Sequence, residues 1–101
     1  MAYTRLLLDK KTEIAAICRR YHVRELSLFG SALGPDFRPD SDVDLLVEFD
    51  SGVPVGLLQF GEMQAELEGL LHRKVDLVSK RGLRPLVRER ILQQLEHVYA
   101  G

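Results

Sequence analysis

Three aspartates on two short apolar segments are the residues best suited to do chemistry. Asp42 and Asp44 are two positions apart at the start of residues 43–49, whose alternating pattern predicts a strand. Residues i and i+2 of a strand project to the same side, so these carboxylates are expected to lie side by side. Asp76 is in the middle of another predicted strand, residues 74–79, and joins them if the two strands are neighbours. Converging carboxylates repel one another without a cation, so the pattern predicts a one- or two-metal site for phosphoryl or nucleotidyl transfer, with Mg²⁺ as the fitting ion.

A Gly-Ser pair at a fixed distance from these aspartates strengthens the prediction. Gly30-Ser31 follows a predicted strand at residues 25–29, and ten residues separate Ser31 from Asp42. Glycine permits close backbone approach to a ligand. A serine hydroxyl, with backbone N–H groups if a helical turn begins there, can hold a phosphate. Asp-x-Asp alone is common by chance, but a phosphate cradle beside paired carboxylates is what nucleoside triphosphate chemistry requires.

Hydrophobic spacing predicts the elements that position these residues. The predicted elements are helices over 4–21, 55–72 and 85–98, strands over 25–29, 43–49 and 74–79, and a loop over 30–41, with or without one short helical turn. This order fits a small α/β fold of the two-layer α+β type, with a mixed three-stranded sheet, helices packed on one face, and the order α-β-α-β-α-β-α. The other face carries Asp42 and Asp44 and is expected to be open to water or to hold a cation, because burying unpaired carboxylates is costly.

Length and composition narrow the class of protein. The chain has 101 residues, read as one domain over 1–101, with 14 basic and 15 acidic residues and a net charge of −1. That balance argues against a nucleic-acid partner, which requires a basic excess. No apolar run is long enough for a membrane span. A single cysteine, Cys18, cannot form an internal disulfide, and a reducing cytoplasm is the expected location.

One segment is basic within this neutral chain. Five of the 14 basic residues fall within residues 80–90. Two interpretations stay open, a solvated helix face and a contact for a triphosphate or an acidic partner surface.

The motif residues resemble a known family. Gly30-Ser31 followed by Asp42-Val43-Asp44 resembles the signature of the polymerase-beta nucleotidyltransferase superfamily, and most closely its smallest branch, the minimal nucleotidyltransferases (MNT). The stretches SDVDLLVEFD and KVDLVSKRGLRP are also similar to sequences of that branch. The resemblance implies a nucleotidyltransferase fold in which Asp42, Asp44 and Asp76 are the catalytic and metal-binding carboxylates, with two Mg²⁺ ions when nucleotide is bound. It also implies that Gly30, Ser31 and Ser41 bind the triphosphate of the substrate ATP.

The resemblance further implies a partner. Members of this branch are commonly encoded beside an all-helical HEPN ribonuclease toxin and act as its antitoxin, transferring AMP from ATP to a tyrosine of the toxin. A hetero-oligomer with a HEPN-type protein is therefore expected. Many relatives carry an arginine soon after the Gly-Ser pair, where this chain has Ala32-Leu33-Gly34, and Arg38 could supply that phosphate contact instead. The alternatives are an antitoxin that acts by docking alone and a nucleotidyltransferase acting on a small molecule of the antibiotic type.

Overall fold

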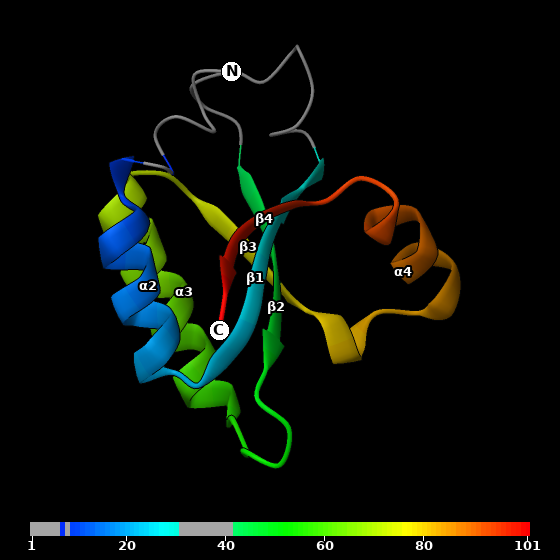
Figure 1. The fold of residues 1–101 in the computed structure, drawn as a ribbon, viewed down its shortest axis with the longest axis horizontal. Helices are drawn as coiled ribbons and strands as arrows, with labels where there is room; N and C mark the ends of the chain where they lie inside the picture. The colour runs from blue at the N-terminus through cyan, green and yellow to red at the C-terminus, as the bar shows by residue number, and fades with distance from the viewer. Residues whose placement is uncertain (1–6, 8, 31–41) are drawn as a thin grey trace.

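The computed structural model describes residues 7, 9–30 and 42–101 as a layered α/β fold (Figure 1). Its elements, in chain order, are α2 (Lys11–Arg20), β1 (Val23–Phe29), β2 (Val43–Phe49), α3 (Leu57–Leu71), β3 (Val75–Ser79), the short 3₁₀ helix η2 (Lys80–Gly82), α4 (Pro85–Leu92) and β4 (Glu96–Ala100). Within the described residues, no helix is both long and apolar enough to cross a membrane. The predicted loop over 30–41, apart from Gly30, lies outside the described residues.

The strands form one mixed sheet in the order β3-β2-β1-β4. β1 is antiparallel to both of its neighbours, whereas β2 and β3 are parallel, as expected for strands joined through the crossover helix α3. The predicted α/β class and mixed sheet are thus confirmed, and the predicted adjacency of residues 43–49 and 74–79 is correct.

The fourth strand corrects the prediction of a helix over 85–98. Helix α4 ends at Leu92, and the chain then returns as β4 along the free edge of β1, with Tyr99 opposite Leu26 and His97 opposite Ser27. Leu95 and Val98 continue a helical spacing in the sequence, but pairing with β1 outweighs that local pattern. Val98 and Tyr99 pack against the core as a result.

Helices α2 and α3 pack on one side of the sheet and enclose the core (Figure 1). The strand residues facing them are fully or almost fully buried, including Leu26, Leu28, Leu45 and Val47. The helices contribute the apolar residues of their inner stripes: Ile14, Ile17, Cys18, Met63, Leu67 and Leu71. The predicted alternation along 43–49 is therefore confirmed, and it leaves Asp44 on the face opposite the helices.

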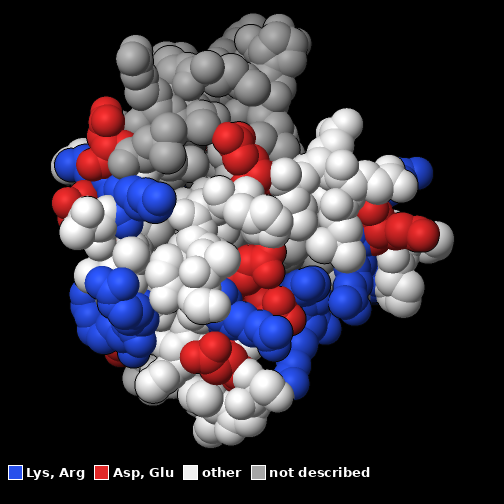
Figure 2. All heavy atoms as spheres, in the orientation of Figure 1, with Lys and Arg blue, Asp and Glu red and all other residues white. Residues whose placement is uncertain are grey.

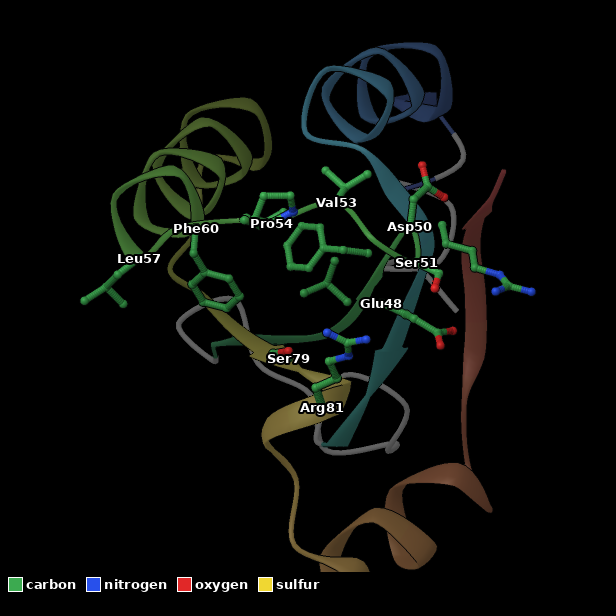
Figure 3. A pocket seen from close by; sticks show the side chains of 14 residues that line it. Glu48, Asp50, Ser51, Val53, Pro54, Leu57, Phe60, Ser79 and Arg81 are labelled. Carbon is green, nitrogen blue, oxygen red and sulfur yellow. The ribbon is translucent and has the colours of Figure 1, made fainter.

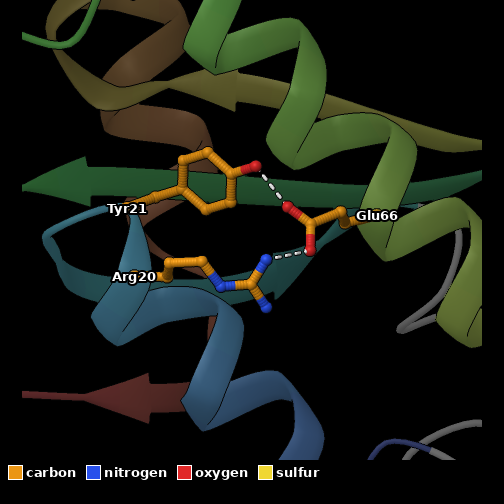
Figure 4. Close-up of polar contacts among 3 residues, drawn as sticks. All are labelled: Arg20, Tyr21 and Glu66. Atoms are coloured by element: carbon orange, nitrogen blue, oxygen red, sulfur yellow. Dashed lines mark hydrogen bonds and ion pairs between the residues drawn. The ribbon is translucent and has the colours of Figure 1, made fainter.

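A three-residue polar contact joins the end of α2 to α3 (Figure 4). Tyr21 donates a hydrogen bond to one carboxylate oxygen of Glu66, and Arg20 forms an ion pair with the other. The hydrogen bond to Glu66 is the main reason that the pKa of Tyr21 rises to about 12, with desolvation adding to it. The same bond lowers the pKa of Glu66. Tyr21 therefore stays protonated at neutral pH and serves as a packing residue.

The face opposite the helices is closed in its middle, which corrects the expectation of a face open throughout. Ser27 and Leu46 are register partners on that face, and both are almost fully buried. At the end of the face away from Asp44, Lys80 forms an ion pair with Glu48 at 3.5 Å. Leu46 can be buried on this face because Asp42 and Asp44 lie at the start of β2, before Leu46.

Candidate functional site

Two of the predicted aspartates are neighbours in the sheet where β2 and β3 begin. Asp44 on β2 and Asp76 on β3 are register partners in parallel strands, and such neighbours project to the same face about 5 Å apart. Asp76 is exposed and Asp44 is half-buried. Asp42 is exposed and immediately precedes β2, two positions from Asp44. The strand pairing therefore places the residues of both predicted segments at one end of one face.

Gly30 is in direct contact with this acidic end of the sheet. β1 ends at Phe29, which is the register partner of Asp44, so the next residue passes beside the Asp44 side chain. Gly30 has a φ of 75°, a conformation that residues with a Cβ rarely adopt. A Cβ at this position would collide with Asp44 Oδ2 and lie 3.1 Å from Asp44 Cγ. Glycine is favoured here for two reasons: the backbone conformation suits it, and a larger residue would displace the Asp44 carboxylate.

This contact links the two halves of the predicted motif. The glycine of the Gly-Ser pair and the second aspartate of Asp-x-Asp are 14 positions apart in the chain, and they touch in the structure. Ser31, Ser41, Ala32-Leu33-Gly34 and Arg38 lie outside the described residues.

The donor set at this end of the sheet consists of carboxylate oxygens, which are ligands for Mg²⁺ rather than for zinc. The sheet register brings Asp44 beside Asp76, and Asp42 is adjacent in sequence. In the described part of the chain, no three His, Cys, Asp or Glu side chains are gathered closely enough to form a ready metal cluster. The residues fit a magnesium site in chemistry and in strand register, and the predicted three-carboxylate cluster itself is not assembled.

A cavity of about 760 Å³ lies at the other end of the sheet, where β2 and β3 finish (Figure 3). Its lining includes apolar side chains of the β2–α3 connection and of α3, among them Val53, Pro54 and Phe60, and the Arg81 side chain points into it. None of Gly30, Asp42, Asp44 and Asp76 lines it. Sequence reasoning did not find this cavity, because its residues come from three separate stretches of the chain and share no motif.

The fold and the Gly30–Asp44 contact define a nucleotidyltransferase-type domain, and comparison with known proteins agrees. The chain belongs to the nucleotidyltransferase domain family, whose profile matches residues 11–97. It is 40% identical over 79 residues to the protein adenylyltransferase MntA of Thermococcus cleftensis, covering 78% of each chain. It is 34% identical over 84 residues to a candidate protein adenylyltransferase of Methanocaldococcus jannaschii, covering 83% of this chain and 88% of the relative.

Solved structures show the same fold. A candidate minimal nucleotidyltransferase superposes with a TM-score of 0.76 at 38% identity, covering 89% of this chain and 90% of the other. A chain of a toxin–antitoxin crystal structure with AMP-PNP superposes with a TM-score of 0.73 at 20% identity, covering 90% of this chain and 73% of the other. At that identity the second likeness speaks for the fold alone.

Proposed function

We propose that this chain is a Mg²⁺-dependent protein adenylyltransferase that transfers AMP from ATP to a tyrosine hydroxyl of a HEPN-type helical toxin and so acts as its antitoxin. The observation that carries the proposal is the placement of Asp44, which lies against Gly30 on one side and in register with Asp76 on the other. The names of the relatives support protein as the acceptor. The cytoplasm is the proposed location, and Cys18 fits it as a buried free thiol whose pKa is raised to about 12 by desolvation.

In the proposed mechanism, Asp42, Asp44 and Asp76 would hold Mg²⁺, which when bound offsets the charge of the triphosphate and acidifies the acceptor hydroxyl. Gly30, Ser31 and Ser41 are proposed to contact the triphosphate, with the bare Gly30 backbone allowing close approach. Asp76 is an exposed carboxylate and is proposed to accept the proton of the acceptor hydroxyl. The acceptor oxygen then forms a bond to the α-phosphorus, the bond to the bridging oxygen breaks, and pyrophosphate leaves.

Transfer of label from [α-³²P]ATP to the helical protein encoded beside this chain tests the proposal. Asp44→Asn is expected to lower the initial rate by about 10²–10⁴-fold, since it removes a charge from the reacting end of the face. Asp50→Asn is the matched control, because Asp50 is an exposed aspartate just beyond the other end of β2. If the wild-type protein protects against the toxin without transferring label, the antitoxin acts by docking alone. If it transfers AMP only to a small molecule, the antibiotic-type alternative is correct.

A further inference from the structure

Helix α4 carries apolar side chains that the fold leaves uncovered. None of its residues is buried, and Leu86 is 80% exposed, Val87 46% and Leu92 40%. A helix of eight residues is too short to be stable in water by itself, so a helix of this length normally packs an apolar stripe against a neighbour. In Figure 1, α4 stands away from the sheet, on the side opposite α2 and α3. The apolar residues of α4 are therefore available to another molecule.

Three arginines lie on α4 or at its N-cap, beside these apolar side chains: Arg84, Arg88 and Arg90. Five basic residues occur within residues 80–90, where Glu89 is the one acidic residue, although the whole chain has a net charge of −1. Figure 2 shows Lys and Arg side chains gathered below and beside α4 on this face of the molecule. Two shallow hollows flank Glu89 on α4, one lined by Arg88 and Leu92 and the other by Leu86 and Arg90. Apolar side chains beside three arginines and one glutamate carry a net positive charge, and they complement a protein surface that is partly apolar and mainly acidic.

The position of α4 relates this surface to the proposed chemistry. Asp44 and Asp76 alternate along their strands with core residues packed against α2 and α3, so they face the opposite side. α4 lies on that same opposite side (Figure 1). A protein bound to α4 would therefore be held on the side of the sheet from which the carboxylates can be reached.

We infer that α4 is the docking surface for the acceptor protein, and that the matching surface of the acceptor is partly apolar and mainly acidic. The α4 surface consists of Arg84, Leu86, Val87, Arg88, Glu89, Arg90 and Leu92. The inference rests on the proposed function for the identity of the occupant. A nucleic acid would use the arginines but leave Leu86 and Leu92 in water, and a basic excess is absent from the chain as a whole. A protein occupant accounts for both kinds of side chain.

Affinity measurements with matched variants test the inference. The binding constant for the helical protein encoded beside this chain would be measured by calorimetry for the wild type, for Leu86→Ala and for the pair Arg84→Glu with Arg88→Glu. Leu86→Ala is expected to weaken binding about tenfold or more, and the charge-reversed pair about 100-fold or more. The controls are Leu58→Ala, because Leu58 is 77% exposed on α3, and the pair Lys11→Glu with Arg19→Glu, because both residues are exposed on α2. Both controls are expected to stay within about twofold of wild type.

The possible results separate this inference from the proposed function. Unchanged affinity in both α4 variants, or no complex with the wild type, overturns the inference. If the wild type is a dimer that Leu86→Ala dissociates, the surface belongs to a second copy of this chain. If the charge-reversed pair loses binding to a labelled single-stranded RNA while its protein complex stays intact, the surface belongs to RNA. Either result overturns the inference. Weakened complexes together with a wild type that transfers no AMP would uphold the docking surface and refute the proposed function alone. Circular dichroism melting confirms that each variant is folded, as expected because α4 has no buried residue.

Discussion

Replacing Gly30 with alanine tests whether the glycine of the Gly-Ser pair keeps the Asp44 carboxylate in its position. The substitution has two physical consequences at this position. A residue with a Cβ in the left-handed region costs about 1–2 kcal/mol, which for a domain of this size corresponds to a melting temperature lower by roughly 4–16 °C. The added Cβ also meets Asp44 Oδ2 and Cγ, so the carboxylate must move away. A displacement of about 1 Å at a reacting centre costs up to about 10²-fold in rate.

Gly52 offers a matched control for the backbone part of this effect. Its φ is 82°, close to that of Gly30, but a Cβ there would meet nothing within 4 Å. Gly52→Ala is therefore expected to lower the melting temperature by a similar amount and leave label transfer unchanged. Gly30→Ala is expected to lower both.

Thermal melting and initial rates of AMP transfer, both measured on the two variants, separate strain from displacement. Rates should be taken at a temperature where all three proteins are fully folded. Gly30→Ala with label transfer within about twofold of wild type would refute the link between Gly30 and Asp44. An equal loss of transfer in Gly52→Ala would also refute it, because that result would trace the loss to strain.

Three further predictions concern the carboxylates and the contact between α2 and α3. Asp76→Asn should lower AMP transfer by about 10²–10⁴-fold in the label assay, while the melting temperature without metal stays equal or rises slightly, because one charge leaves an acidic neighbourhood. The double variant Asp42→Asn with Asp44→Asn should lose binding of Mn²⁺, used as a spectroscopic substitute for Mg²⁺, because adjacent oxygen ligands are removed. Tyr21→Phe should reduce the loss of stability at alkaline pH. The pKa of Tyr21 is raised from 10 to about 12 by Glu66, so the contribution of this hydrogen bond to the free energy of unfolding is complete below pH 10 and disappears as the pH rises through about 12.

Each of these predictions has a result that contradicts it. Full AMP transfer by Asp76→Asn would remove Asp76 from the proposed chemistry. Equal Mn²⁺ affinity in the wild type and the double variant would exclude the aspartates as the metal site. Unfolding curves of the wild type and of Tyr21→Phe would be measured between pH 10 and 12. If both proteins lose stability in parallel, the hydrogen bond from Tyr21 to Glu66 contributes nothing to stability.

The strands β1 to β3, the helices α2 and α3 and the face of β2 that carries Asp44 were predictable because they depend on local pattern. Alternation along 43–49 places Asp44 opposite Leu45 and Val47 whichever strand lies beside it, since successive side chains of a strand point to opposite faces. The helical spacing of Met63, Leu67 and Leu71 likewise determines which side of α3 is buried. The Gly-Ser and Asp-x-Asp motifs could be recognised for the same reason, since their spacing is visible in the chain itself.

Tertiary structure alone decided the features that depend on which segments meet. β4 forms because the edge of β1 offers hydrogen-bonding partners to residues 96–100. The hydrophobic spacing within residues 96–100 does not indicate this pairing. The partnership of Asp44 with Asp76 depends on the register of two parallel strands, and the contact of Asp44 with Gly30 depends on where β1 ends beside β2. The exposure of Val87 on α4 is of the same kind. An apolar residue at helical spacing is expected to be core from the sequence, and only the position of the helix in space leaves Val87 46% exposed.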